Sequence, residues 1–158
     1  MTSAVDERWL QQAVDLATAN VAAGGGPFGA VVVRGDAVVS TGVNRVTRDL
    51  DPTAHAEVTA IRGACRDLGT FALGGCTLYS SCEPCPMCAA SALWARLDRV
   101  VFAANRHDAA DGGFDDRAFY DLLASAPPAW PTPVQELRLG SAVAPFDAWR
   151  GNPLRVDY

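Results

Sequence analysis

Four residues in two short stretches have the types and the spacing that metal-assisted chemistry needs. His55-Ala56-Glu57 and Pro84-Cys85-Pro86-Met87-Cys88 together supply one imidazole, one carboxylate and two thiols. A catalytic zinc site takes three nitrogen or sulfur ligands and leaves a fourth position open for water. His55, Cys85 and Cys88 provide that set, and Glu57 remains to move protons. The pattern therefore predicts a catalytic zinc centre.

Each part of this pattern also has a simpler interpretation. A single histidine is more often structural than a ligand, and a single glutamate on a helix is usually a solvated charge. A Cys-x-x-Cys pair can be redox-active or half of a structural zinc site, and Cys82 forms such a pair with Cys85 as well. Cys85 and Cys88 are favoured because they project from one face of a helix, in a first turn whose dipole favours thiolates. Cys82 is then interpreted as a small packed residue, and Cys65 and Cys76 as core residues.

The expected ligand set leaves a clear role for the carboxylate. Two thiolates and a neutral imidazole make the metal site formally neutral, and the metal lowers the pKa of a water in the open position toward about 7. Glu57 is not a fourth ligand if it serves as the base. A structural zinc site would instead have four ligands and no spare carboxylate. Because His55 and Glu57 do not share a helix face, the reacting group is expected to lie between them.

Length, charge and cysteine content restrict the remaining possibilities. With 158 residues the chain suits one domain, here expected to cover residues 1–158. A net charge of -5 and a pI near 4.8 disfavour a nucleic-acid surface, which needs clustered Lys and Arg, and favour a small neutral substrate. No apolar run is long enough for a membrane, and residues 1–8 lack a signal-peptide pattern. The five cysteines favour the reducing cytoplasm over a disulfide framework.

Hydrophobic periodicity and turn residues predict the elements that position these groups. The predicted helices are 5–23, a helix from His55 to Leu68 with Thr53 as N-cap, 84–97, and a helix starting near Arg117 with Asp115 as the preferred cap. The predicted strands are 30–33, 38–43, 77–79 and 99–103, with a turn at 35–36 and a loop at 44–53. Alternating helices and strands indicate a mixed α/β sandwich around one sheet.

Beyond the metal pattern, longer motifs resemble a known family. His-x-Glu with Pro-Cys-x-x-Cys is the signature of zinc nucleobase deaminases. The chain resembles the bacterial guanine deaminases of the cytidine-deaminase fold in motifs from Pro27 to Tyr158. These motifs are Pro27-Phe28-Gly29-Ala30, Asp51 to Val58, Ser81 to Cys88, Ala109-Ala110, Gly113-Phe114-Asp115-Asp116 and Pro145 to Arg150, with the terminal Tyr158.

This resemblance implies a fold, partners and an activity. The fold is a three-layer α/β/α arrangement around a central mixed five-stranded sheet. The partners are a second copy of the chain, whose active site is covered by the crossing C-terminal segment of about residues 140–158, and a small purine base. Neither nucleic acid nor a membrane is implied as a partner. The activity is the zinc-dependent hydrolysis of guanine to xanthine and ammonia.

The resemblance also implies roles for individual residues. Glu57 would take a proton from the attacking water and pass it to a ring nitrogen, and Asp116 would pass a proton to the leaving amine. Substrate contacts would come from Phe28, Asn44, Ala54, His55, Trp94 and Tyr158.

Residue type alone leaves several of these roles open. Asn44 is equally typical of a turn, Phe28 and Trp94 are typical of a core, and a terminal Tyr158 is usually frayed. Asp115 and Asp116 are both typical helix caps, and only the resemblance assigns the catalytic role to Asp116 rather than to Asp115. Departures from the family at Ala89 to Leu93, Asn105 to Asp108 and Ala126 to Pro133 bear on substrate size. Guanosine, another aminopurine or a triazine are alternative substrates. A tRNA adenosine deaminase, which needs a basic face, and a non-catalytic zinc module are further alternatives.

Overall fold

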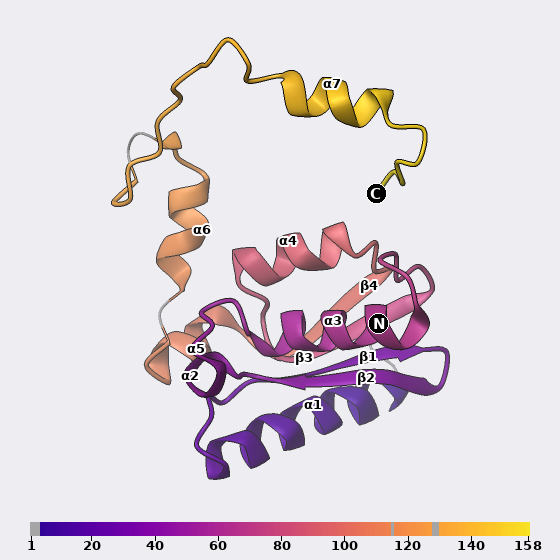
Figure 1. Cartoon of the computed structure of the whole chain (residues 1–158). Coiled ribbons are helices and arrows are strands. Elements are labelled where there is room, and N and C mark those ends of the chain that lie inside the picture. Colours follow the sequence, from indigo (N-terminus) through magenta and orange to yellow (C-terminus); the bar gives the residue numbers. More distant parts are fainter. Residues whose placement is uncertain (1–3, 115, 128–129) are drawn as a thin grey trace. The chain divides into compact units, whose positions relative to one another are not determined.

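The computed structural model of the chain describes residues 4–114, 116–127 and 130–158 (Figure 1). The described residues fall into two compact units, Met1–Tyr120 and Asp121–Tyr158. All of the elements that carry the metal-site pattern belong to the first unit. The expectation of one domain over 1–158 stays a prediction.

A mixed sheet forms the centre of the first unit. Its strands are β1 (Gly29–Arg34), β2 (Ala37–Val43), β3 (Cys76–Cys82) and β4 (Arg99–Ala104), in the order β2-β1-β3-β4. β1 runs antiparallel to β2 and β3, and β3 runs parallel to β4. Gly35, with φ +59°, makes the β1–β2 turn, a conformation that residues with a Cβ rarely adopt.

The expectation of five strands is wrong for the described residues, which form a four-stranded sheet. The alternating apolar stretch at 134–139 is the remaining candidate for a fifth strand, and it lies in the second unit. There it has no neighbouring strand among the described residues of that unit, so its backbone forms no hydrogen-bond ladder. Its apolar side chains Val134, Leu137 and Leu139 are exposed.

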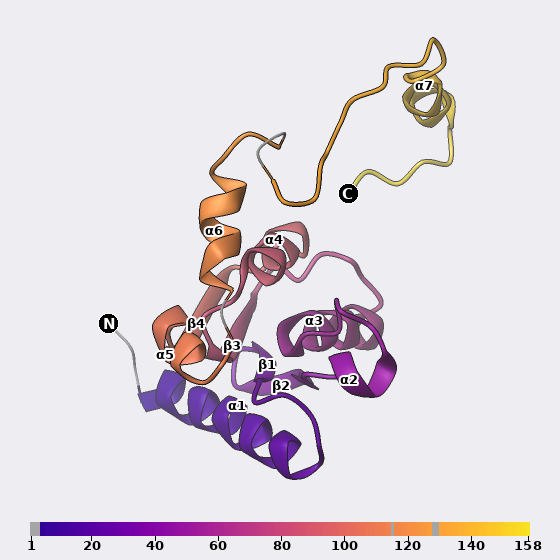
Figure 2. The ribbon, with the colours of Figure 1, turned by 90° about the vertical axis from the view of Figure 1, so that its left-hand side faces the viewer.

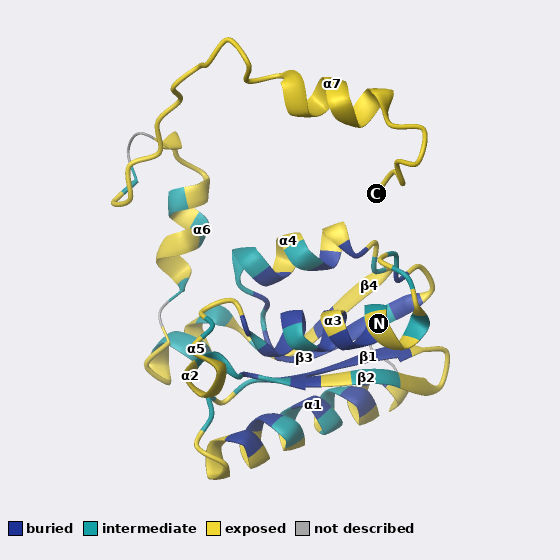
Figure 3. Ribbon diagram, viewed as in Figure 1, coloured by how far each residue is buried: buried dark blue, intermediate teal, exposed yellow. Residues whose placement is uncertain are grey.

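Helices cover both faces of the sheet (Figures 1 and 2). α1 (Ala4–Ala22) lies on one face, and α3 (Ala56–Leu68) and α4 (Pro86–Trp94) lie on the other. Alternation along β1 divides its side chains between two cores: Val32 packs toward α3, whereas Val31 and Val33 pack toward α1. Because both faces are covered, β1 is buried along most of its length (Figure 3), and the α/β/α layering is confirmed.

The backbone of α3 lies directly against the backbone of β2, with no side chain between them. A Cβ built on Gly42 of β2 would stand 2.2 Å from the carbonyl oxygen of Ala56 and 2.5 Å from the amide nitrogen of Ala60. Only a residue without a side chain fits between strand and helix at this position. Ala56 lies between His55 and Glu57, so this contact fixes the height of the metal-site end of α3 above the sheet.

A buried polar cluster ties α1 to two strands. Asp6 of α1 accepts hydrogen bonds from the Tyr79 hydroxyl at 2.7 Å and from both Nη atoms of Arg99 at 2.9 Å. Burial and the neighbouring Asp6 raise the pKa of Tyr79 to about 12. The buried Asp6 carboxylate is therefore satisfied by one neutral and one charged partner, as a buried charge requires.

The shorter helices refine the predicted pattern. The predicted loop at 44–53 contains α2 (Val46–Asp49), α5 (Arg106–Asp111) follows β4, and α6 (Arg117–Leu123) begins where a helix was expected. Thr53 is not the N-cap of α3. His55 holds that position, and the Thr53 hydroxyl instead donates to Asp51 Oδ1 at 2.7 Å. The other preferred cap, Asp115, lies outside the described residues.

The second unit contains α7 (Ala144–Gly151), which is exposed along its length (Figure 3). Within this unit the ring of Tyr158 meets the ring of Trp149 edge-on, with centroids 6.1 Å apart. Arg155 Nη1 donates to the carbonyl oxygen of Arg150 at 2.7 Å, which folds the terminal residues back onto α7. In the described part of the chain, no helix combines the length and the apolar character needed to span a membrane.

Candidate metal centre and active site

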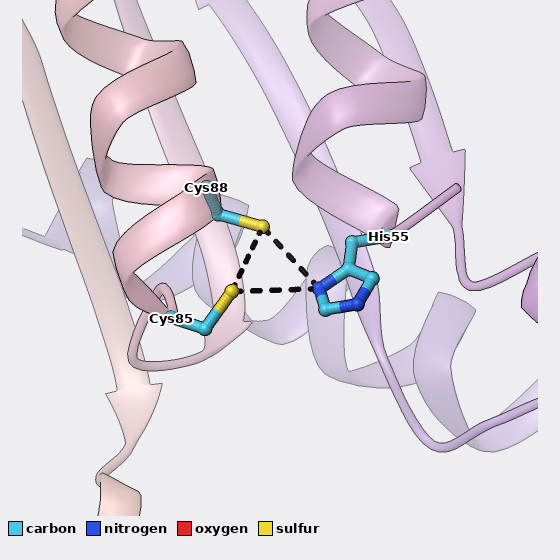
Figure 4. A group of neighbouring side chains, drawn as sticks. All are labelled: His55, Cys85 and Cys88. Carbon is cyan, nitrogen blue, oxygen red and sulfur yellow. Dashed lines mark hydrogen bonds between the residues drawn. The ribbon is translucent and has the colours of Figure 1, made fainter. Parts of the chain in front are cut away.

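The three predicted ligands meet at the N-termini of two helices (Figure 4). His55 is the N-cap residue of α3 and Cys85 is the N-cap residue of α4, while Cys88 lies in the first turn of α4. Pro86 takes the first helical position of α4, where its missing N–H costs nothing. Two positive helix ends therefore face the same point, which favours anionic thiolates there.

The ligand atoms form a compact triangle. Cys85 Sγ lies 3.6 Å from Cys88 Sγ and 3.6 Å from His55 Nδ1, and Cys88 Sγ lies 3.5 Å from His55 Nδ1. Tetrahedral zinc, with bonds of about 2.3 Å to sulfur and 2.0–2.1 Å to nitrogen, requires separations of about 3.8 Å and 3.6 Å. The triangle matches both values closely. His55, Cys85 and Cys88 thus fit a tetrahedral metal ion with one position left for water.

The two thiols share one proton between them. Cys88 acts as hydrogen-bond donor to Cys85, which lowers the pKa of Cys85, and His55 lowers it further. The same hydrogen bond, together with burial, raises the pKa of Cys88. The hydrogen bond to Cys85 also raises the pKa of His55. Cys85 is the thiol poised as thiolate, and a bound metal cation would stabilise the anionic form of both thiols.

Glu57 lies beside the triangle but outside the ligand set. It is the second residue of α3, and Ser80 Oγ of β3 donates to its Oε1 at 3.3 Å. Its residue is only 5% exposed, and this burial raises the pKa of its carboxyl. Burial that raises a carboxyl pKa moves it toward the range in which a general acid and base works.

A cavity of about 490 Å³ opens beside the triangle, within the range of small-molecule sites. His55, Glu57 and Cys85 form part of its wall. The complete lining consists of Gly24, Gly25, Gly26, Phe28, Asn44, Val46, Thr47, His55, Glu57, Cys82, Glu83, Cys85, Ala109, Phe114 and Asp116.

Asp116 also lines this cavity, and its Oδ1 is buried with no hydrogen-bond partner among the described residues. Burial, followed by the nearby Cys85, raises the pKa of its carboxyl. A buried acceptor without a protein partner is costly unless a ligand supplies the donor. The structure therefore brings the predicted second carboxylate to the same cavity as Glu57.

Asn44 and Phe28 both line the cavity, as expected. The side-chain Oδ1 of Asn44 accepts from the Val46 amide at 3.3 Å, so the turn role of Asn44 is present together with its place at the cavity. Asn20 holds this corner: its Nδ2 donates to the carbonyl oxygens of Gly26 at 2.8 Å and Asn44 at 2.9 Å. Phe28 meets Phe114 edge-on with centroids 5.0 Å apart, and the pair gives the cavity an aromatic wall.

Three predicted substrate contacts do not line this cavity. Ala54 is buried, and its carbonyl oxygen accepts a hydrogen bond from the Arg45 amide at 2.9 Å. Trp94, at the end of α4, is 62% exposed, and the Arg96 guanidinium lies over its ring. Tyr158 belongs to the second unit. The substrate roles of these three residues stay predictions.

Several lining residues had no predicted role. Phe114 stands next to Asp115 in a motif in which only the two aspartates had predicted roles, and Glu83 directly precedes Pro84 of the metal motif. Cys82, as expected, is buried outside the ligand triangle, and burial raises the pKa of its thiol to about 11. The glycines at 24–26, which follow α1, also bring backbone to the cavity.

Comparison with known proteins agrees with this geometry. Residues 3–104 match the family model of the cytidine and deoxycytidylate deaminase zinc-binding region. The guanine deaminase of Bacillus subtilis (strain 168) is 47% identical over 153 residues, covering 96% of this chain and 98% of the relative. A solved structure of that enzyme superposes with a TM-score of 0.94 over the same shares of the two chains.

More distant relatives match a smaller part of the chain. A protein solved in complex with 2,6-diaminopurine is 35% identical, with a TM-score of 0.68 over 73% of this chain and 65% of that one. The tRNA-specific adenosine deaminase of Aquifex aeolicus (strain VF5) is 45% identical over 78 residues, covering 49% of this chain and 52% of the relative.

The layered fold, the three-ligand triangle and the buried glutamate define a zinc-type deaminase, and the chain belongs to the cytidine and deoxycytidylate deaminase family. Its likeness to the Bacillus enzyme extends over both units rather than over the metal region alone. Within that family the chain belongs to the guanine deaminases.

Proposed function

We propose that the chain hydrolyses guanine to xanthine and ammonia with zinc held by His55, Cys85 and Cys88. The observation that carries this proposal is a pair of carboxylates, the buried Glu57 and the partly buried Asp116 with its buried Oδ1, which share one cavity with the ligand triangle. When bound, zinc supplies a water that loses a proton near neutral pH.

Glu57 accepts that proton and delivers it to a ring nitrogen of the base. The water oxygen then bonds to the carbon that carries the exocyclic amine. The hydrogen bond from Ser80 fixes one carboxylate oxygen of Glu57, and the absence of bulk water around a buried carboxylate keeps the proton on this path. Each positioned proton transfer contributes typically about 10²–10⁴-fold to the rate.

Asp116 completes the reaction at the amine. Its buried Oδ1 is an acceptor for an amine N–H, and the carboxyl, whose pKa burial raises, passes a proton to the departing nitrogen. The carbon–nitrogen bond breaks and ammonia leaves. The hydroxyl formed from the water gives up its remaining proton, which replaces the proton that Asp116 gave to the amine, and its oxygen becomes a carbonyl oxygen of xanthine. Asn44 contacts the purine edge, and Phe28 with Phe114 packs against its face.

A homodimer is part of this proposal. The described residues of α4 and of the second unit carry exposed apolar side chains, among them Leu93, Trp94, Phe146 and Leu154, that a second copy would cover. The segment of about residues 140–158, with Tyr158 at its end, is proposed to cover the active site of the partner copy. The cytoplasm is the proposed location, since a thiolate site with five free cysteines suits a reducing compartment.

The test is ammonia release by the zinc-loaded protein with guanine, guanosine, adenine, cytosine and cytidine as separate substrates. Guanine should give the highest kcat/KM, and metal-free protein should give no turnover until zinc is restored. Turnover of guanosine without turnover of guanine would reject guanine as substrate. Retention of zinc without ammonia from any of the substrates would favour a binding module.

A further inference from the structure

The stretch from Asn105 to Asp108 contacts the metal-ligand turn. Arg106, the first residue of α5, directs its guanidinium at Glu83, the residue before Pro84 of the turn between β3 and α4. Arg106 Nε lies 3.1 Å from both carboxylate oxygens of Glu83, its Nη2 also donates to Oε1, and its backbone amide donates to Oε2 at 2.9 Å. This forked contact fixes both the position and the orientation of Glu83.

Tyr120 closes the other side of the same turn. The Arg106 guanidinium lies over the Tyr120 ring at 3.6 Å from its centroid, and the Tyr120 hydroxyl donates to the carbonyl oxygen of Pro84. Glu83 and Pro84 are consecutive, so Glu83, Arg106, Tyr120 and Pro84 form a closed ring of contacts. We name this ring the turn clamp.

The turn clamp joins two parts of the active site. Pro84 directly precedes the ligand Cys85, and Tyr120 lies about one helical turn after Asp116. Arg106 itself does not line the cavity, whereas Glu83, Cys85 and Asp116 do. Arg106 therefore affects turnover through the residues that it holds and through its positive charge, which acts on the Asp116 carboxylate.

α5 does not depend on this arginine side chain for its own start. The side chain of Asn105 accepts from the amides of His107 and Asp108, and the Asp108 carboxylate accepts from the Asn105 amide at 2.8 Å. This capping box satisfies the helix end without the guanidinium. Substitutions of Arg106 are thus expected to leave α5 and the fold in place.

We propose that Arg106 is a positioning residue. Through the turn clamp, it fixes the position of the metal ligand Cys85 relative to the carboxylate of Asp116. The inference rests on the proposed deamination. Outer partners of metal ligands are worth about 10–100-fold in metal affinity or activity. The clamp acts on the metal and Asp116 side of the cavity, whereas Phe28 and Asn44 come from the ends of β1 and β2.

The test uses Arg106→Ala, Arg106→Lys and Tyr120→Phe in the full zinc-loaded chain, with Arg66→Ala, an exposed arginine of α3, as matched control. Two readouts are measured: the rate of zinc loss to a colorimetric chelator, and kcat and KM for guanine. Arg106→Ala should lose zinc about tenfold faster and turn over about tenfold more slowly, with KM changed less than about threefold. Arg106→Lys should restore part of both, since lysine keeps the charge without the fork.

The outcomes separate the turn clamp from general stability and from the proposed function. Wild-type zinc loss and kcat in both Arg106 variants would overturn the inference, as would a lower melting temperature with an unchanged kcat. If Arg106→Ala does not fold, Arg106→Lys and Tyr120→Phe are judged by the same two readouts. If the wild-type protein does not deaminate guanine, the proposed function fails, while zinc loss still decides whether the clamp holds the ligand turn.

Discussion

Replacement of Glu57 by glutamine tests the centre of the proposed chemistry. Glutamine has nearly the volume of glutamate, and its amide oxygen can keep the hydrogen bond from Ser80. The substitution therefore removes the ability to carry a proton while it preserves the packing. It also replaces a buried carboxyl, whose ionised form is costly at 5% exposure, by a neutral group. The melting temperature should accordingly stay the same or rise.

The expected effect on turnover follows from what Glu57 does. One lost proton transfer costs about 10²–10⁴-fold, which raises the barrier by about 2.7–5.5 kcal/mol. Because the proposal gives Glu57 two consecutive transfers, the loss should fall in the upper part of this range. Zinc content should stay at that of the wild-type protein, since Glu57 lies outside the ligand triangle.

Ammonia release from guanine, measured together with metal analysis of the same sample, checks both expectations. Glu7→Gln is the matched control, because Glu7 is an exposed glutamate in the first turn of α1. Turnover within about threefold of wild type, with zinc bound, would refute the role of Glu57 as the proton carrier. Loss of both zinc and turnover would instead show that Glu57 is needed to bind the metal.

Three further predictions concern the surroundings of this centre. Asn20→Ala should raise KM for guanine and lower the free energy of unfolding in urea by about 1–3 kcal/mol for each carbonyl left unpaired, because Asn20 holds Asn44. Its side chain is 4% exposed, so a stability loss below about 0.5 kcal/mol would contradict this. The pKa of Tyr79, raised to about 12 when folded, predicts stability that is complete below about pH 10 and lost as the pH rises toward 12. Tyr79→Phe should remove part of that loss in alkaline unfolding curves. Deletion of Asp157 and Tyr158 should lower kcat/KM for guanine, and an unchanged value would reject the proposed cover.

The metal centre was predictable because its information is local. His55 and Glu57 are two residues apart, Cys85 and Cys88 are three apart, and helix geometry converts those spacings into directions. What spacing cannot give is which helix ends meet in space. α3 and α4 both begin at this point because the strands that precede them, β2 and β3, run in the same direction on either side of β1 and end at the same edge of the sheet. The strands were predictable for a similar reason, because a run of consecutive valines such as that of β1 is typical of a buried strand.

The missed features depend on contacts between distant residues. Arg106 and Tyr120 contact Glu83 and Pro84 across 23 and 36 positions of sequence, and no local pattern announces such pairs. Thr53 was chosen as a helix cap from its residue type, but its hydroxyl is taken by Asp51, so His55 became the cap. The fifth strand was inferred from the resemblance alone, and the described residues give its candidate stretch no partner.

The backbone contact between Gly42 and Ala56 has a consequence for how this enzyme can change over generations. One wall of the cavity rests on a helix that touches the sheet without a side chain between them, so mutation can hardly shift that wall. Other lining residues are Gly24 to Gly26, which follow α1, and Asn44 to Thr47, which lead from β2 into the short helix α2. Selection for a larger or differently shaped substrate would therefore find its variation in these two segments. The contact between α3 and the sheet thus preserves the groups that carry out the reaction, whereas substitutions in the two segments alter the range of substrates.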